Sequence, residues 1–191
     1  MKKAKKILIL ALCALLLVGA TIAGTVAYLT STDSVENTFT VGNVAITMVE
    51  SVVDEYGAKT SGTTDTGNTY KLIPGHEYTK DPTIKVSEGS EDCYIFVEID
   101  NGLGADAALT MSADWAKVSK TENKSVWVYG TAAEPVPVGA ENDAVVPFTA
   151  FTFGEEADPA AYSAAKITVT AYAIQADGLD AKTAAELWAL F

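Results

Sequence analysis

A strictly alternating run near the C-terminus constrains the fold of this chain most. Residues 166–174 place Ile167, Val169, Ala171 and Ala173 on one face and mostly polar side chains on the other. A period of two residues is the pattern of a β-strand with one buried face, whereas an amphipathic helix repeats every 3.6 residues. The chain is therefore expected to build its core around a β-sheet.

Six further segments favour strands because they alternate or are rich in β-branched and aromatic residues. They are residues 39–49, 70–73, 83–86, 94–99, 125–129 and 145–153. The first slips in phase at Gly42-Asn43, which predicts a β-bulge or a bend. The last contains Pro147, which predicts an edge strand or a bulge. Seven or so strands in one chain of 191 residues predict an all-β, jelly-roll-like β-sandwich.

Helical patterns are scarce. Asp180 is expected to cap a short C-terminal helix. The apolar stripe of that helix is Ala184, Leu187, Trp188 and Phe191. Residues 160–165 are expected to form a helical turn. Residues 57–69 and 135–143, which are rich in turn-forming residues or carry two prolines, are expected to be loops.

The first 27 residues have the organisation of a secretory signal peptide. Four lysines precede an unbroken apolar run at 7–18, and small residues follow up to Ala27. Cleavage is expected between Ala27 and Tyr28, leaving residues 28–191 as a single secreted β-sandwich domain. Because apolar or small residues continue to Leu29, a retained membrane anchor stays open as the alternative.

Charge narrows the classes of partner. The whole chain has a net charge of −12 and contains no arginine. Without residues 1–27 it keeps nine lysines against 25 acidic residues, a net charge of −16. Such a surface repels phosphate, so nucleic acid is not an expected partner, and membrane contact is expected only through the signal peptide. Cys93 would be the single remaining cysteine, which excludes an internal disulfide.

Residues able to carry catalysis are few. His76-Glu77 resembles half of the helical zinc-protease motif, but position 80 is Lys and the chain has no second histidine. His76 is therefore predicted to be an exposed loop residue. Cys93 has no histidine to activate it and is predicted to be a small buried side chain. No catalytic, cofactor-binding or metal-binding residue is expected, and the chain is not expected to be an enzyme.

Two further surface patterns have ordinary explanations. Asp65, Glu155, Glu156 and Asp158 lack the dense spacing of a calcium loop and are predicted to be solvated. The triplet that begins at Asn123 matches a glycosylation site, which has meaning only in a host that reads it.

The junction after the apolar run resembles a known family. Residues 24–30 (GTVAYLT) and 35–44 (VENTFTVGNV) look like the start of exported proteins processed by a SipW-type signal peptidase. These are the TasA, CalY and camelysin-like proteins of Gram-positive bacteria. Residues 72–75 and 80–86 resemble a turn-and-strand segment of that family, and 167–179 resembles a C-terminal strand of its clostridial members. Residues 101–143 resemble nothing in it.

The resemblance implies a jelly-roll domain at the cell surface that forms fibres of a biofilm matrix. It also implies processing by the SipW-type peptidase, after which the freed N-terminal segment inserts as a strand into the next subunit. Mapped onto this sequence, that donor lies within residues 28–44. Its assembly positions are Val35, Phe39, Val41 and Val44.

The physics of strand addition agrees with this mapping. An added strand gains backbone hydrogen bonds, and pockets take its alternate side chains. Head-to-tail donation does not close on itself, so it yields filaments. The alternative is that residues 28–44 pair within their own domain and leave a monomeric surface adhesin or ligand-binding domain. Some family members have been described as metallo-endopeptidases. This sequence lacks the paired ligands for that chemistry, but a camelysin-like metallo-endopeptidase stays open as a further alternative.

Overall fold

The computed structural model describes residues 43–191, which carry eleven β-strands and one short α-helix. Predictions for the signal peptide, its Ala27–Tyr28 junction, and Val35, Phe39 and Val41 lie outside these residues. The strands are β1 (Ile46–Val53), β2 (Lys59–Thr64), β3 (Glu77–Thr79), β4 (Thr83–Val86), β5 (Cys93–Asn101), β6 (Ala107–Met111), β7 (Trp115–Lys120), β8 (Lys124–Tyr129), β9 (Pro137–Val138), β10 (Phe148–Phe153) and β11 (Ile167–Gln175). The helix is α2 (Ala184–Trp188), and 3₁₀ turns occupy Gly104–Asp106 and Pro159–Tyr162.

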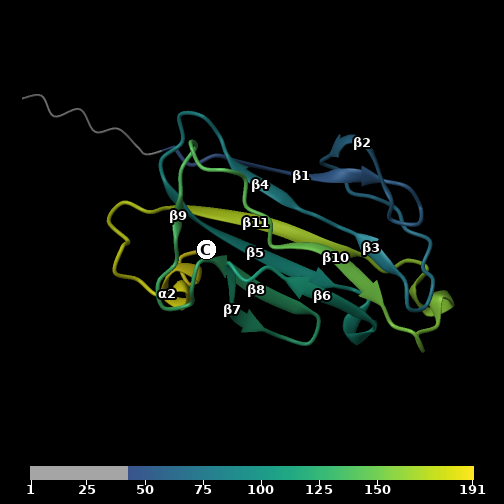
Figure 1. The fold of residues 1–191 in the computed structure, drawn as a ribbon. Coiled ribbons are helices and arrows are strands. Elements are labelled where there is room, and N and C mark those ends of the chain that lie inside the picture. The colour runs from purple at the N-terminus through teal and green to yellow at the C-terminus, as the bar shows by residue number, and fades with distance from the viewer. Residues whose placement is uncertain (1–42) are drawn as a thin grey trace, which may run out of the picture. The chain divides into compact units, whose positions relative to one another are not determined.

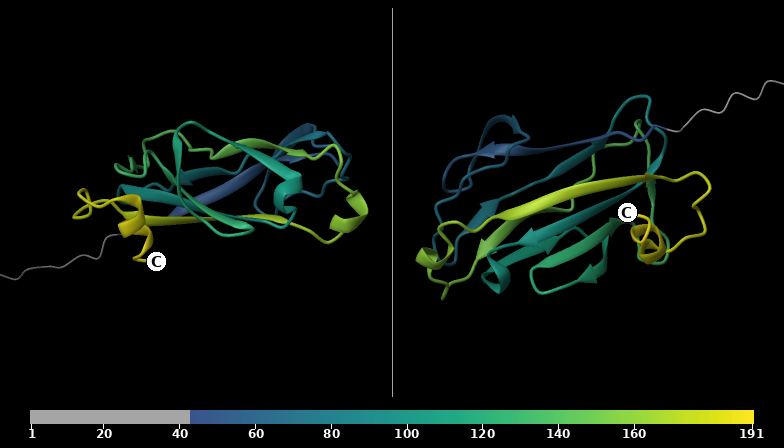
Figure 2. Two further views of the ribbon diagram at one scale, coloured as in Figure 1. Left: turned by 90° about the horizontal axis from the view of Figure 1, so that it is seen from below. Right: turned by 180° about the vertical axis from the view of Figure 1, so that it is seen from behind.

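Two antiparallel layers form a jelly-roll-like sandwich (Figures 1 and 2). One layer has the order β11-β5-β8-β7, with β9 beside one end of β5. The other contains the groups β2-β1-β4 and β3-β10-β6. A bridge between Ile84 of β4 and Val145, just before β10, connects these two groups. The predicted all-β sandwich with a short C-terminal helix is confirmed.

Strand β5 lies at the centre of the packing because both of its faces are covered. Ile95, Val97 and Ile99 point between the layers, where they pack with side chains such as Ile84 of β4. Tyr94 and Phe96 point the other way, toward Leu187 of α2. All of these side chains are at least 95% buried. This double burial explains the continuous apolar run of β5, because each face needs its own apolar set.

Helix α2 packs on the outer face of the β5 sheet at the end where β5 begins (Figure 2). Its cap is Thr183 and not the predicted Asp180, which lies in the preceding turn. Thr183 Oγ1 accepts from the Glu186 backbone N–H, while the Glu186 carboxylate accepts from the Thr183 N–H, so two free donors at the helix start are satisfied together. The predicted stripe is confirmed for Ala184 and Leu187, which are buried.

Several predicted boundaries need correction. Residues 70–73 do not form a strand, and the predicted loop 57–69 contains β2. Strands β3, β6 and β7 were not predicted. Pro147 precedes β10, which lies between β3 and β6 and so is not an edge strand, but the predicted irregularity is present as a register shift between Phe148 and Phe151. The helical turn expected at 160–165 appears as the 3₁₀ turn at Pro159–Tyr162.

Strands predicted from alternation are confirmed in β4, β5, β8 and β11. The strand predicted at 39–49 begins at Ile46 within the described residues and continues to Val53. Loop 135–143 is largely confirmed, with the two-residue β9 inside it. No helix within residues 43–191 is long and apolar enough to cross a bilayer.

Candidate functional site

Strand β11 presents a long, regular edge. It pairs with β5 along all nine residues, from Ile167 opposite Asn101 to Gln175 opposite Cys93, with no shift in register. It is the last strand of its sheet, and within residues 43–191 no strand pairs with its other side. An unpaired edge offers a row of free backbone donors and acceptors to another strand.

The hydrogen bonds between β11 and β5 show which backbone N–H and C=O groups of β11 point to the open side. Gly102 donates to the Lys166 carbonyl and Ala176 donates to the Asp92 carbonyl, so even-numbered residues of β11 exchange bonds with β5. The odd-numbered residues therefore direct their N–H and C=O groups to the open edge. Val169 and Ala171 are among these, and their side chains contribute half-buried apolar contacts to the core between the layers.

Two other edge strands, β7 and β2, are less suited to accept a strand. Strand β7 carries Lys117 and Lys120, and its pairing with β8 shifts between Lys117 and Ser119. Charged side chains and bulges of this kind discourage edge-to-edge pairing. Strand β2 is shorter and almost wholly exposed. By contrast, β11 is nine residues long and contains no charged residue.

The end of the predicted donor segment belongs to its own domain. Asn43 accepts a backbone hydrogen bond from Glu91, and Ala45 accepts one from Ser87. The Ala45 N–H donates to Ser90 Oγ at 2.9 Å. Val44 is half-buried and packs against the core between the layers. Of the four predicted assembly positions, Val44 is the one within the described residues, and it is anchored in its own chain.

A polar network crosses beneath β1. Its members Glu50, Lys80 and Asp81 are all the charged side chains that are buried in the described part of the chain. Lys80 Nζ donates to Glu50 Oε1 at 2.6 Å. Asp81 accepts from the Ser51 N–H at 2.8 Å and from Ser51 Oγ at 2.7 Å. Buried charges are stable when they are paired and hydrogen-bonded, as these are.

Lys59 completes the Asp81 end of this network, with its Nζ 2.7 Å from Asp81 Oδ2. Burial by itself would raise the pKa of the Asp81 carboxyl, but the hydrogen bonds from Lys59 and Ser51 outweigh it and hold that pKa below its ordinary value. Asp81 is therefore ionised at neutral pH and fastens the segment before β4 to β1.

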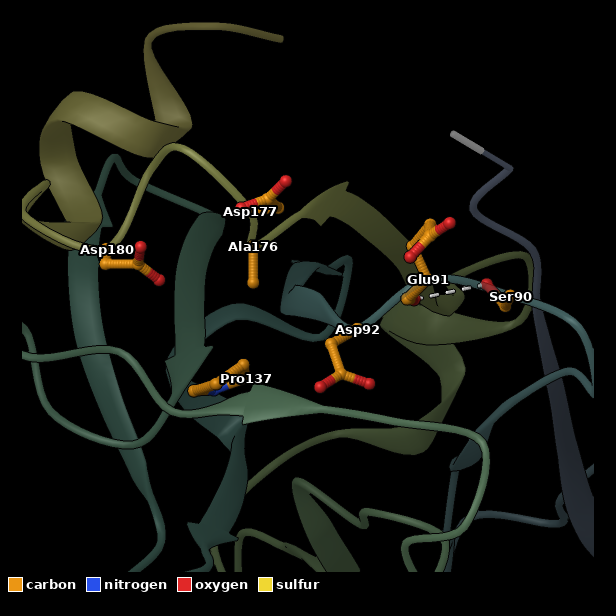
Figure 3. A pocket seen from close by; sticks show the side chains of 7 residues that line it. All are labelled: Ser90, Glu91, Asp92, Pro137, Ala176, Asp177 and Asp180. Atoms are coloured by element: carbon orange, nitrogen blue, oxygen red, sulfur yellow. Dashed lines mark hydrogen bonds between the residues drawn. The ribbon is translucent and has the colours of Figure 1, made fainter. Parts of the chain in front are cut away.

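A shallow pocket lies at the end of the sheet where β5 begins (Figure 3). Its cavity is about 390 Å³, and carboxylates of Glu91, Asp92, Asp177 and Asp180 surround it. Among residues 43–191, no three histidine, cysteine or acidic side chains are arranged so that they could share a metal ion. The pocket therefore adds negative potential to this end of the domain, and no binding role is assigned to it.

His76 differs from its prediction as an exposed residue. It lies in the turn before β3, but it is half-buried. Its Nε2 is 2.8 Å from the Tyr56 carbonyl oxygen, and its ring packs edge-on against Tyr78 with centroids 4.6 Å apart. Lys80, at the position where a zinc helix would have its second histidine, is held by Glu50. These contacts give His76 a structural role.

The prediction that Cys93 is a small buried side chain is confirmed. Its side chain is fully buried at the start of β5, with Sγ 3.7 Å from the Val138 carbonyl oxygen. Burial, with a smaller contribution from the charge of Asp92, raises the pKa of the thiol to about 11.

Cys93 is accordingly expected to resist alkylation in the folded protein. At pH 8 the thiolate, which is the reactive form, is scarce, and the side chain is covered. Iodoacetamide labelling followed by mass spectrometry should show at least tenfold slower modification in buffer than in 6 M guanidinium chloride. Equal rates in the two conditions would contradict the buried environment.

The remaining surface predictions agree with the structure. Asp65, Glu155, Glu156 and Asp158 are exposed, and Asp158 also caps the 3₁₀ turn at Pro159 by accepting from the Ala160 N–H. Asn123 is exposed just before β8.

Two features were not predicted from the sequence. The open edge of β11 depends on the order of strands in the sheet, which alternation does not reveal. The buried network joins residues up to 30 positions apart. One local feature of the sequence pointed to this network: the adjacent charged residues Lys80 and Asp81 lie shortly before β4, two of whose four residues are buried.

A scan against protein-family models found no match, and searches of curated proteins and of solved structures also found none.

Proposed function

We propose that this chain is an exported structural subunit that assembles into extracellular fibres by strand addition. The observation that carries the proposal is the open edge of β11, with nine residues, regular register and no charge. This edge has the backbone groups and the half-buried apolar side chains that an added strand requires. The domain as described contains no metal-sharing cluster, and the proposal involves no catalytic step.

The donor in this proposal is the segment before the anchored residues 43–45. Phe39 and Val41 alternate with threonines there, in the pattern of a strand with one apolar face. Removal of the signal peptide before Tyr28 would free this segment. A segment of one subunit on the edge of the next gives a head-to-tail contact that repeats without closing, so the product is a filament. The site of action is the cell surface or the extracellular matrix.

Deletion of residues 28–42 from the processed chain, which removes Phe39 and Val41 with the rest of the proposed donor, is expected to abolish filament growth and leave the domain folded. Growth can be followed by light scattering of the chain that begins at Tyr28, over time and concentration, with electron microscopy of the product. Filaments from the deleted chain, or a parent that stays monomeric at all concentrations, would contradict the proposal. A stable parent monomer would instead favour an adhesin or a ligand-binding domain.

The acceptor edge can be tested in the same assay with Ala171→Pro. The Ala171 N–H points to the open side, so proline removes a donor from the edge without removing a bond to β5. Elongation is expected to slow at least tenfold while the unfolding midpoint stays near that of the parent. Thr170→Ala, on the exposed outer side, is the matched control and should elongate normally.

A further inference from the structure

The carboxylate of Glu50 in β1 contacts both a lysine and an asparagine. Lys80 Nζ is 2.6 Å from Glu50 Oε1, and Asn68 Nδ2 is 3.3 Å from Glu50 Oε2. Glu50 belongs to β1, Asn68 follows β2, and Lys80 lies between β3 and β4. The amine and the carboxamide therefore come from opposite sides of β1 and meet on the two oxygens of the same group.

The carboxamide of Asn68 is fixed in place. Its Nδ2 also donates to the Ser51 carbonyl at 2.9 Å, and its Oδ1 accepts from the Val53 N–H at 3.1 Å. A carboxamide that is already held in one orientation, on the carboxylate that Lys80 also contacts, requires little further ordering in order to react.

The surroundings of Glu50 and Lys80 are largely closed to water. The two side chains are 11% and 7% exposed. Tyr70 lies close by, because its hydroxyl donates to the Thr79 carbonyl, and its ring packs edge-on against Tyr78 and Phe151. Burial raises the pKa of the Tyr70 phenol, and the negative charge of Glu50 adds to the effect. The Lys80 amine and the Glu50 carboxylate therefore contact each other with little competition from water.

We propose that Lys80 and Asn68 form an intramolecular isopeptide bond, with Glu50 as the proton carrier. Glu50 takes a proton from the Lys80 ammonium, and the neutral Nζ attacks Cγ of Asn68. The Cγ–Nζ bond forms, the Cγ–Nδ2 bond breaks, and Nδ2 leaves as ammonia with the proton that Glu50 returns. Glu50 then takes the second proton from Nζ, so that the new amide keeps one hydrogen and Glu50 ends protonated. The reaction needs no oxidant, reductant or other partner, and its product is lighter by one ammonia.

The bond would tie together the segments on both sides of β1. The expected secreted chain has one cysteine and cannot form an internal disulfide, so an amide cross-link would be its covalent means of holding these segments together. The inference rests on residues 50, 68 and 80 alone and does not depend on whether the chain forms fibres.

A Lys-specific protease map of the purified, denatured protein tests the bond directly. Without the bond, digestion yields separate peptides 60–71 and 72–80, because Lys80 is free to be cleaved. With the bond, Lys80 resists cleavage, and peptide 60–71 appears joined to peptide 72–85 with a mass about 17 Da below the sum of the two. The intact chain should show the same deficit of about 17 Da.

Three variants should each restore the full mass and release peptide 60–71 unjoined. In Lys80→Arg the protease cannot cut after residue 80, so the other peptide is then 72–85. Lys80→Arg keeps the positive charge but removes the amine, Asn68→Ala removes the carboxamide, and Glu50→Gln removes the proton carrier. Lys59→Arg is the matched control, because Lys59 contacts Asp81 and not Asn68. It should keep the deficit of about 17 Da in the intact chain, while its joined peptide begins before residue 60 because the protease no longer cuts after residue 59.

Two results would overturn the proposal. One is a parent protein of full sequence mass whose Lys80 is cleaved, a measurement that does not depend on whether any variant folds. The other is a deficit of about 17 Da with Lys80 still cleaved, because a succinimide at an asparagine gives the same loss without joining two peptides.

Discussion

Phe96→Ala is expected to lower the free energy of unfolding by about 3–5 kcal/mol, the range for removing a fully buried aromatic ring. Phe96 is 0% exposed and lies in the middle of β5, which pairs with both β11 and β8. Its ring also packs against Trp188, with centroids 5.7 Å apart. The truncation would leave a cavity between the sheet and α2 that neighbouring backbone cannot fill without breaking its pairing.

Phe191→Ala provides the matched control, since the same truncation acts on a ring that is 53% exposed. Its contacts with Phe96 and Tyr172 are partial, so a loss of about 1 kcal/mol or less is expected. Urea unfolding followed by tryptophan fluorescence gives both values from the midpoint and the slope. Equal losses from the two variants would contradict the assignment of Phe96 to the packing beneath α2.

The strands that were predicted correctly are those whose burial pattern can be recognised from a few consecutive residues. In β11 and β5, successive side chains point to opposite faces of the sheet. Residue type therefore alternates in β11, and residues 93–97 of β5, which are buried on both faces, are all apolar. The same is true of β4, where Ile84 and Val86 are buried and Lys85 is exposed. Burial on a pleated strand has a period of two, and a local window is enough to detect it.

The strands that were missed are held by backbone pairing or by distant contacts. Strand β2 is polar and exposed, so it has no apolar face to detect. Residues 70–73 look like a strand because Tyr70 and Leu72 are apolar, but these side chains pack against Tyr78 and Phe151 from a loop. Similarly, Asp180 was preferred as a helix cap, although Thr183 has the glutamate three residues later that a reciprocal cap requires.

The candidate site was predictable only in part. Alternation identified β11 as a strand, but its position at the edge follows from the order of all strands in the sheet. The contacts of Glu50 with Asn68 and Lys80 could not be predicted from the sequence. Asn68 and Lys80 lie 18 and 30 residues after Glu50, and they reach it only once β1 has paired with a strand on each side. The half-buried state of His76 likewise depends on Tyr56, which lies 20 residues earlier.

Asp81→Ala is expected to lower the free energy of unfolding at pH 7 by about 3 kcal/mol, because it breaks a buried, charged network. Asp81 is 7% exposed and accepts hydrogen bonds from the Ser51 N–H, Ser51 Oγ and Lys59 Nζ. Removing the carboxylate leaves the Ser51 donors unsatisfied beside β1. Asp81→Asn keeps the shape and loses the charge, so a smaller loss is expected from it.

The pH dependence separates the charge of Asp81 from its packing. Its folded-state pKa is lowered from the ordinary value of 3.8, so the folded protein binds this proton more weakly than the unfolded chain does. The stabilisation is therefore complete above pH 3.8 and is lost as the pH falls through the lower, folded-state value. The difference in free energy of unfolding between the parent and Asp81→Asn should consequently become smaller as the pH is lowered below about 4.

Asp65→Asn is the matched control for this titration, because Asp65 is exposed in the turn after β2. It should change the free energy of unfolding by about 0.5 kcal/mol or less, as surface substitutions do. Urea unfolding of the three proteins between pH 2 and pH 7 gives the comparison. A parent–Asp81→Asn difference that stays constant over this range would mean that the contribution of Asp81 is steric, and that its charge does not fasten the segment before β4 to β1.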